Sequence, residues 1–350
     1  MENIIENGIV DMRKCSLSDR NGTYGGQAGY KDGVIYNHER WIVKYPKSTV
    51  GMSRVGELKY TTSPLSEYIG SHIYQILGYD VHETLLALRR DKIAVACKDF
   101  RRDGAELLEI RTIKNAVNER LAEELDTSVE STGSDHYVDL KTMFLHLEHN
   151  DILNGIKGLK DRFWDMVVVD ALINNNDRNN GNWGILRNNG IDTLAPVFDN
   201  GGAFYGKVPE SKIIERLQSN KMVEQSALGT ITTFGEDGKP ISLEDMFGRD
   251  YDGLLMAVKR NYPIIKDKMP EIEQMIRSIP KEHSYIETDG NTVEKKTLPV
   301  CSDERKDYYI KTMQIRLDKV LAPAYERAIG KFPSNANEHQ PDMVHNAIRL

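Results

Sequence analysis

Two carboxylates and one carboxamide in the middle of the chain have the types and the spacing that phosphoryl transfer needs. The segment 174–182 reads NNNDRNNGN, so that Asp177 and Asn182 lie five positions apart, and Asp199 follows seventeen positions later. Phosphoryl transfer requires a carboxylate that orients the acceptor hydroxyl and accepts its proton, together with oxygen ligands for magnesium. The D-x-x-x-x-N spacing is typical of a catalytic loop with an Asp base and an Asn metal ligand. We predict Asp177 as the base, and Asn182 and Asp199 as metal ligands.

The same segment has a plainer interpretation, because runs of Asn and Asp commonly form turns. The flanking sequence favours catalysis. Leu159–Ile173 has apolar residues at helical spacing and predicts a buried helix that leads into the loop. Two short strands, Trp183–Leu186 and Ile191–Phe198, are predicted after the loop, which places Asp199 at a strand end. Asn200 then occupies the position of the phenylalanine in the D-F-G motif of kinases.

Upstream residues supply what the phosphate end of such a site requires. Lys44 ends a predicted strand, and Glu67 lies in the first turns of the next predicted helix. A kinase uses a strand lysine on the phosphates and steadies it with a helix glutamate. A glycine-rich turn precedes the strand, and its backbone amides could approach phosphate oxygens. The residues chosen there are Gly25, Gly26, Gln27 and Ala28.

A further candidate nucleotide-binding segment lies at the end of the last predicted strand before the helical region. A kinase hinge at this place would hold adenine through backbone groups, and an acidic side chain could reach the ribose. An ordinary strand-to-loop junction explains each single residue equally well. The candidate nucleotide contacts at this junction are Ala96, Cys97, Lys98 and Asp99.

The predicted elements divide the chain into a strand-rich first part and a mainly helical second part. The first part has predicted strands at 34–37, Trp41–Tyr45, Val81–Leu88 and Lys92–Cys97, and a helix from Ser63 that ends at Gly78. A clear helix near Asp307–Ile329 belongs to the second part. We predict an α+β, two-lobed, kinase-like fold, with a small β-rich N-lobe over 1–100, a larger helical C-lobe over 101–331 and a flexible tail over 332–350.

Composition argues against several classes of protein. The 350 residues carry a net charge of −7, whereas a dedicated nucleic-acid binder needs a basic face. Cys15, Cys97 and Cys301 are far apart and predict neither a disulfide framework nor a metal site. No run of 18 apolar residues predicts a membrane span, and the acidic N-terminal segment has no signal-peptide core. We expect a cytoplasmic protein, and leave open export by a route without a signal peptide.

Five segments together resemble the HipA-like serine/threonine kinases, and more closely the compact CtkA-type members that lack the extra N-terminal lobe of HipA. The segments are YGGQAGYK (24–31), WIVKYP (41–46), SEYIGSHIYQILG (66–78), NNNDRNNGN (174–182) and LAPVFDNGG (194–202). The resemblance covers about residues 15–330. It implies a kinase that uses ATP and Mg²⁺ and phosphorylates serine or threonine in proteins. By position it assigns the base to Asp177, the metal to Asn182 and Asp199, and the phosphate contact to Lys44 with Glu67.

The resemblance also implies regulation and partners. Kinases of this family often phosphorylate themselves in or near the glycine-rich loop, where Ser16, Ser18 and Thr23 are the nearby hydroxyls. Our leading hypothesis is a protein kinase that acts as a bacterial toxin or effector, and an antitoxin-type partner is left open. One alternative is a lipid or small-molecule kinase, because phosphatidylinositol kinases share this loop style. Another is a nucleotide-binding scaffold without activity, although every position needed for the base and the metal is occupied by a competent residue.

Overall fold

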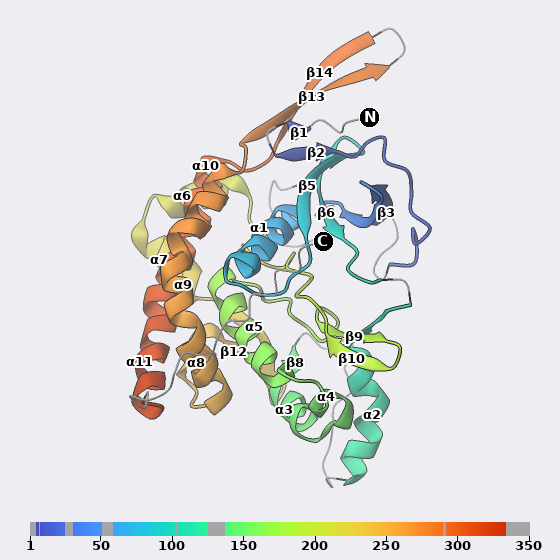
Figure 1. Ribbon diagram of the computed structural model, residues 1–350. Helices are drawn as coiled ribbons and strands as arrows, with labels where there is room; N and C mark the ends of the chain where they lie inside the picture. The colour runs from blue at the N-terminus through green and yellow to red at the C-terminus, as the bar shows by residue number, and fades with distance from the viewer. Residues whose placement is uncertain are drawn as a thin grey trace.

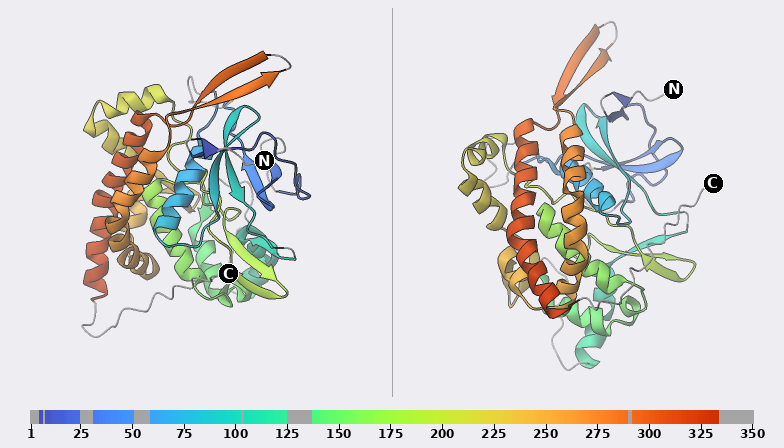
Figure 2. Two further views of the ribbon diagram at one scale, coloured as in Figure 1. Left: turned by 45° about the horizontal axis from the view of Figure 1, so that its top comes forward. Right: turned by 60° about the vertical axis from the view of Figure 1, so that its left-hand side comes forward.

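The computed structural model describes residues 5–6, 8–24, 31–50, 59–102, 104–124, 137–289 and 292–333. A strand-rich part formed by the first third of the chain lies beside a larger, mainly helical part (Figures 1 and 2). This arrangement is the predicted α+β, two-lobed architecture. The lobe boundaries near residues 100 and 331 remain predictions. Among the described residues, no helix combines the length and the apolar character needed to cross a bilayer.

Within the described residues, the strand-rich part is built on a six-stranded sheet. Its strands are β1 (Ile5–Glu6), β2 (Ile9–Asp11), β3 (Lys31–Tyr36), β4 (Glu39–Lys44), β5 (Thr84–Arg89) and β6 (Lys92–Lys98), in the order β1-β2-β5-β6-β4-β3. All neighbours are antiparallel except β2 and β5. The predicted hairpin is β3–β4. Its turn residues Asn37 and His38 both have positive φ, as the favoured type of two-residue hairpin turn requires.

Helix α1 (Ser63–Ile76) carries Glu67 between the sheet and the helical part. Pro64 occupies the first turn, where its missing N–H costs nothing, and Gly78 ends the segment with a φ of +86°. Ile69 and Ile73 are fully buried, because α1 packs against β5 and β6 on one side and against α9 (Asp252–Ser278) on another. Helix α1 therefore contacts both the sheet and the helical part.

Helix α5 (Leu159–Ile173), which leads into the predicted catalytic loop, has the predicted bounds. It is buried on nearly every side and packs against α9. The other helices of this part are α2 (Ile110–Glu124), α3 (Leu140–His149), α4 (Asp151–Asn154), α6 (Glu210–Leu217), α7 (Asn220–Leu228), α8 (Leu243–Gly248), α10 (Asp303–Arg316) and α11 (Ala322–Lys331), with the π-helical segment η1 (Leu317–Leu321) between the last two.

Short strands complete the helical part. They are β7 (Glu106–Glu109) with β9 (Gly184–Asn188) and β10 (Ile191–Leu194), then β8 (Val138–Asp139) with β11 (Ile231–Glu236) and β12 (Lys239–Ser242), and the hairpin β13 (Glu282–Asp289) with β14 (Thr292–Pro299). The β13–β14 hairpin projects from the end of the molecule that carries β1 and β2 (Figure 1).

Three predicted elements differ from the structure. The strand predicted over Ile191–Phe198 ends at Leu194, and only Val197 beyond it forms a bridge, with Val81. Val81, the first residue of the strand predicted to end at Leu88, lies in this bridge, and the observed strand β5 begins at Thr84. The helix predicted near Asp307–Ile329 is one helical run that contains the π segment η1. The prediction did not include the β13–β14 hairpin, whose long strands pair mainly with each other and so leave little core-facing pattern.

Candidate active site

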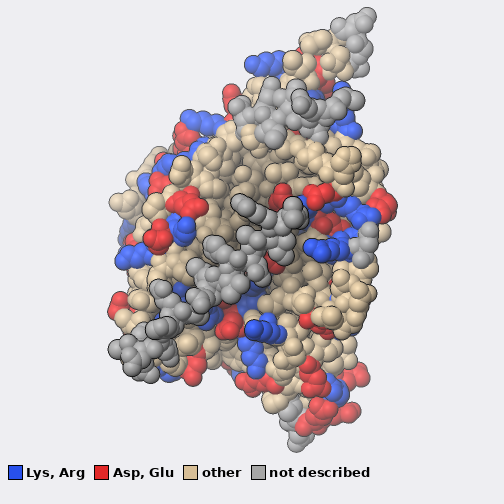
Figure 3. Space-filling view, viewed as in Figure 1, with Lys and Arg blue, Asp and Glu red and all other residues tan. Residues whose placement is uncertain are grey.

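A cavity of about 820 Å³ lies between the sheet and the helical part. This volume is within the range of roughly 300–1,000 Å³ found for small-molecule sites. Lysine and arginine side chains are intermixed with acidic ones over the visible face of the molecule (Figure 3). Predicted site residues from both parts of the chain line the cavity: Lys44, Glu67, Asp177, Asn182 and Asp199.

Lys44 joins the two parts through a pair of ionic contacts. Its Nζ lies 3.0 Å from Oε2 of Glu67 and 2.5 Å from Oδ1 of Asp199. Burial disfavours the charged ammonium, but the two carboxylates outweigh this effect and hold the pKa of Lys44 well above its ordinary value. Burial likewise opposes ionisation of Glu67 and of Asp199, yet Lys44 keeps the pKa of both carboxyls below the usual range. All three side chains are therefore charged at neutral pH.

Local structure explains why these side chains meet. Lys44 is the last residue of β4, and strand alternation turns it away from buried Val43. Glu67 lies in the second turn of α1 and is 1% exposed. Asp199 follows the bridge residue Val197 and has a φ of +60°, a left-handed conformation that Asp adopts more readily than most residues. The turn at Asp199 lets its carboxylate meet Lys44 across the cavity.

The predicted catalytic loop is held by its own amide side chains. Asn174 ends α5 in the left-handed conformation, with a φ of +55°. The Asp177 N–H donates to Oδ1 of Asn175 at 3.3 Å, and Nδ2 of Asn182 donates to the Asp177 carbonyl at 2.5 Å. Nδ2 of Asn179 donates to Oδ1 of Asp177 at 3.1 Å. The asparagines thus orient an exposed Asp177 carboxylate at the cavity.

Gly202 is a site residue that our sequence reasoning did not single out. A Cβ on Gly202 would lie 2.6 Å from Cβ of Asp177 and 2.7 Å from Oδ1 of Asn175, both closer than real contacts allow. The segment after Asp199 can therefore approach the catalytic loop only with glycine at this position. The paired glycines 201 and 202 were the available signal, because adjacent glycines often mark a close backbone approach.

The donor set at the cavity fits a hard divalent cation such as Mg²⁺. Asp199 lines the cavity as an ionised carboxylate whose side chain is 34% exposed. Nδ2 of Asn182 is used on the Asp177 carbonyl, which leaves the amide oxygen as its possible ligand atom. Carboxylate and amide oxygens suit Mg²⁺, which usually takes only one or two protein carboxylates and completes its shell with water and substrate phosphates.

The predicted adenine-binding junction at Ala96–Asp99 has its polar groups engaged elsewhere. The Lys98 N–H donates to the Glu83 carbonyl, and the Asp99 N–H donates to the Arg40 carbonyl, each at 2.9 Å. The Asp99 carboxylate accepts from Arg20, Tyr24 and Arg101.

Ala96 and Cys97 lie inside a strand that is paired on both sides, with β4 and β5. Of this neighbourhood, Val95 lines the cavity. The four residues of the junction, 96–99, are therefore not presented to a nucleotide in this conformation. Their nucleotide contacts stay a prediction without geometric support. The physical reason is that the sheet and the arginines satisfy the same groups that adenine and ribose would need.

The structure also places residues that the sequence did not reveal as functional. Lys31 opens β3 and lines the cavity near Lys44. Its burial and the repulsion from Lys44 lower the pKa of Lys31. Arg111 lines the same cavity and donates to Oδ1 of Asn179 at 3.0 Å. A single lysine or arginine carries no spacing signal, which is why neither was predicted. The predicted phosphate-binding residues Gly25, Gly26, Gln27 and Ala28 lie outside the described residues.

The three hydroxyls considered for self-phosphorylation differ in exposure. Ser18 is 7% exposed, and its N–H donates to the Gly33 carbonyl at 2.8 Å, which ties it to β3. Ser16 and Thr23 are exposed. A phosphoacceptor must enter an active site, so the structure favours Ser16 and Thr23 over Ser18 as acceptors.

Comparisons with known proteins give a single family. No protein-family model matches the chain. The serine/threonine-protein kinase CtkA of Helicobacter pylori is 30% identical over 325 residues, which are 91% of this chain and 89% of that protein. The crystal structure of a Helicobacter pylori proinflammatory kinase CtkA matches with a TM-score of 0.74 at 29% identity, over 92% of this chain and 99% of that one.

A Shewanella oneidensis HipA structure, solved with HipB and operator DNA, matches with a TM-score of 0.47 at 13% identity, over 87% of this chain and 69% of that one. The similarity to CtkA extends over most of both chains, 91% of this one and 89% of the other. The chain belongs to the CtkA family of serine/threonine-protein kinases.

Proposed function

We propose that this kinase transfers phosphate from ATP, with Mg²⁺, to serine or threonine of proteins, through Asp177, Asn182, Asp199, Lys44 and Glu67. The observation that carries the proposal is the ionic bridge of Lys44 to both Glu67 and Asp199 at the cavity that Asp177 also lines. This is the phosphate-end arrangement that an active kinase requires. In its general form, use of a nucleotide and a divalent metal follows from membership of a kinase family.

Each residue has a distinct task in this proposal. Asp177 accepts the proton of the acceptor hydroxyl as the hydroxyl oxygen attacks the terminal phosphorus of ATP, while the bond from that phosphorus to the bridging oxygen breaks and ADP leaves. Lys44 holds phosphate oxygens, and Glu67 keeps its ammonium in place. Asn182 and Asp199 would hold Mg²⁺, which neutralises the charge that develops on the phosphates. The Asn179 and Asn182 contacts keep the Asp177 carboxylate directed at the cavity.

We also propose that the enzyme phosphorylates itself, and that Ser16 or Thr23 is the acceptor. Both hydroxyls are exposed and belong to the segment that precedes β3. Ser18 is the least suitable acceptor because its neighbours enclose it. A role as a toxin or effector, and an antitoxin-type partner, remain hypotheses for this kinase.

The test is incubation of the purified chain with labelled ATP and Mg²⁺, beside Asp177→Ala, followed by phosphosite mapping by mass spectrometry. We expect label on serine or threonine of the wild type and none on the variant. ATP turnover without labelled protein, or transfer to an added lipid, would reject the protein acceptor. Equal labelling of the Asp177→Ala variant would reject Asp177 as the base.

A further inference from the structure

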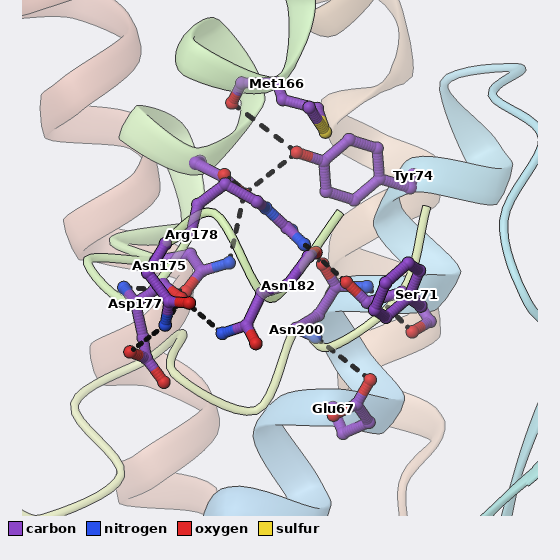
Figure 4. Close-up of polar contacts among 12 residues, drawn as sticks. Glu67, Ser71, Tyr74, Met166, Asn175, Asp177, Arg178, Asn182 and Asn200 are labelled. Atoms are coloured by element: carbon purple, nitrogen blue, oxygen red, sulfur yellow. Dashed lines mark hydrogen bonds and ion pairs between the residues drawn. The ribbon is translucent and has the colours of Figure 1, made fainter. Parts of the chain in front are cut away.

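Asn200, which follows the metal-binding candidate Asp199, is completely buried and uses all of its polar groups. Its N–H donates to Oε1 of Glu67 at 2.9 Å, and its Nδ2 donates to Oγ of Ser71 at 2.9 Å, so two bonds reach helix α1. Its Oδ1 accepts from the guanidinium of Arg178 in the catalytic loop. Through its backbone N–H and its side chain, Asn200 thereby contacts both halves of the active site (Figure 4).

On the side of helix α1, Asn200 completes the environment of Glu67. Oε2 of Glu67 pairs with Lys44, whereas Oε1 accepts from the Asn200 N–H and contacts Nε2 of His82 at 3.0 Å. Ser71 contacts the same nitrogen of His82 at 3.0 Å and accepts from Asn200. Three groups therefore hold the carboxylate of Glu67: the Lys44 ammonium, the Asn200 N–H and the His82 ring. Of these three, Lys44 lines the cavity.

On the side of the catalytic loop, the guanidinium of Arg178 is buried and held by several hydrogen-bond acceptors. It donates to both carboxylate oxygens of Asp170, at 2.8 and 3.1 Å, and to the Asn182 carbonyl at 2.9 Å. It also donates to the Phe198 carbonyl. Arg178 directly follows the proposed base Asp177, so a shift of its guanidinium would move the loop that carries the base.

Helix α1 and the Asp199–Asn200 segment are in close contact at Gly70. A Cβ on Gly70 of α1 would lie 2.8 Å from Cβ of Asn200, closer than real contacts allow. The helix therefore touches the Asp199–Asn200 segment directly. A phenylalanine, which kinases usually carry at this position, could neither fit this contact nor donate to Ser71 and accept from Arg178.

We infer that Asn200 is a positioning residue that couples Glu67 of helix α1 to Arg178 of the catalytic loop, so that both halves of the active site are held in place together. The inference rests on the proposed roles of Lys44 and Glu67. Displacement of α1 away from Lys44 would separate Asn200 from Glu67 and Ser71. A buried amide that loses a partner is costly, so Asn200 opposes this displacement as long as Arg178 holds its other end.

A double-mutant cycle tests this coupling. The variants are Asn200→Leu, Glu67→Gln and the double variant, assayed for kcat and KM with Mg-ATP and casein as acceptor. Residues that act through one another are strongly non-additive. We expect Asn200→Leu alone to reduce kcat/KM for ATP by roughly tenfold to a hundredfold, the range given by coupled contacts. In the Glu67→Gln background the same substitution should reduce it less than threefold, on the order of the additivity error.

Two further variants separate positioning from folding. Asn261→Leu is the matched control, since Asn261 is also a buried asparagine, 2% exposed, whose amide donates to Asp165 at 2.7 Å away from the cavity. It should lower the Tm, as Asn200→Leu does, but leave kcat/KM within about twofold at a temperature well below the Tm. Ser71→Ala removes one partner of Asn200 and should reduce kcat/KM severalfold while the protein stays folded, which keeps the test valid if Asn200→Leu does not fold.

The outcomes distinguish the inference from the proposed function. An equal loss for Asn200→Leu in both backgrounds would overturn the coupling through Glu67, as would full activity of both Asn200→Leu and Ser71→Ala. If Glu67→Gln itself keeps full activity, the proposed role of Glu67 fails first. A loss for Asn261→Leu as large as that for Asn200→Leu would also overturn the inference, because any buried asparagine would then have the same effect.

Discussion

Two groups of buried polar side chains in this kinase differ in a way that separates catalysis from structure. The cluster that we propose to be catalytic, called the catalytic cluster below, consists of Lys44, Glu67 and Asp199, all charged and joined by ion pairs. The structural cluster lies between α2, α3 and α4 and consists of Asn118, His146 and Asn150. There His146 Nε2 contacts Oδ1 of Asn118 at 2.7 Å, and its Nδ1 contacts Nδ2 of Asn150 at 3.1 Å.

The difference is in what each cluster leaves open. The side chains of Lys44 and Asp199 keep 18% and 34% of their surface exposed at the cavity, so they can accept a ligand. His146 and Asn150 are fully buried, and both ring nitrogens of His146 contact neutral amide side chains. Buried charge is expensive unless it is paired, and in the catalytic cluster each charge has an opposite partner. Partial exposure to the cavity thus supports the catalytic role that we propose for the first cluster.

The largest effect should come from removal of the charge at the centre of the catalytic cluster. Lys44→Met leaves the two carboxylates without their cation and should lower kcat roughly a hundredfold to a thousandfold, the range for loss of one electrostatic contact in an active site. Initial rates with labelled ATP measure this. Lys141→Met is the control, because Lys141 pairs with Asp237 on the surface. A Lys44→Met enzyme with more than a tenth of the wild-type rate would remove the catalytic cluster from the mechanism.

Acid should break the structural cluster. Burial, followed by repulsion from Lys114, lowers the pKa of His146 to about 4. The unfolded chain therefore binds more protons than the folded one between pH 6.5 and 4, so stability falls as the pH falls through this window and levels off below it. The loss amounts to up to about 3 kcal/mol.

Urea unfolding of the wild type and of His146→Gln at several pH values measures this contribution. Glutamine does not titrate, and its amide can replace one hydrogen bond of the imidazole. The stability difference between the two proteins should shrink as the pH is lowered from 6.5 to 4. A constant difference across this range would show that His146 is not kept neutral by the fold.

A smaller effect should follow from crowding of the catalytic loop without any change of charge. Gly202→Ala places a methyl group 2.6 Å from Cβ of Asp177, so the loop must move. A displacement of this size near the reacting groups should reduce kcat by roughly tenfold to a hundredfold. Gly330→Ala is the control, because nothing lies within 4 Å of its added Cβ. Unchanged kcat for Gly202→Ala would mean that the loop accommodates the methyl group.

The smallest effect concerns the second lysine at the cavity. Lys31→Met removes a cation near Lys44 and should raise KM for ATP by roughly threefold to tenfold with little change in kcat, as expected for loss of one charged contact to the phosphates. Steady-state kinetics at varied ATP measures it. A reduced kcat at unchanged KM would instead assign Lys31 to the transferred phosphate.

The elements around the site were predictable where the signal is local. Helix α5 has apolar residues at helical spacing, Pro64 and Gly78 bracket α1, and the β3–β4 hairpin follows from strand patterns and a polar turn. The D-x-x-x-x-N spacing predicted the loop for the same reason, since six consecutive residues contain the whole motif. Each of these signals needs only neighbours in the sequence.

Other features depend on partners that are distant in the sequence. The carboxylate of Asp99 could reach a ribose by its place in the sequence, which gives no sign that Arg20, 79 positions earlier, donates to it. The buried role of Asn200 depends on Ser71, and Gly202 is required only because Asp177 approaches it. The paired glycines 201 and 202 indicate a close backbone approach, but nothing in the neighbouring sequence identifies the partner at any of these positions.

The amino-acid sequence by itself determined the family, the two-part architecture and the candidate residues for phosphoryl transfer. The reason is that side-chain chemistry and the spacing of apolar residues depend only on neighbours in the sequence. The tertiary structure alone decided which of these residues meet. Lys44 contacts Asp199 across 155 positions, and Asn200 links α1 to the catalytic loop. Such contacts follow from how the sheet, α1 and α5 pack, and packing depends on the whole buried surface rather than on any short segment.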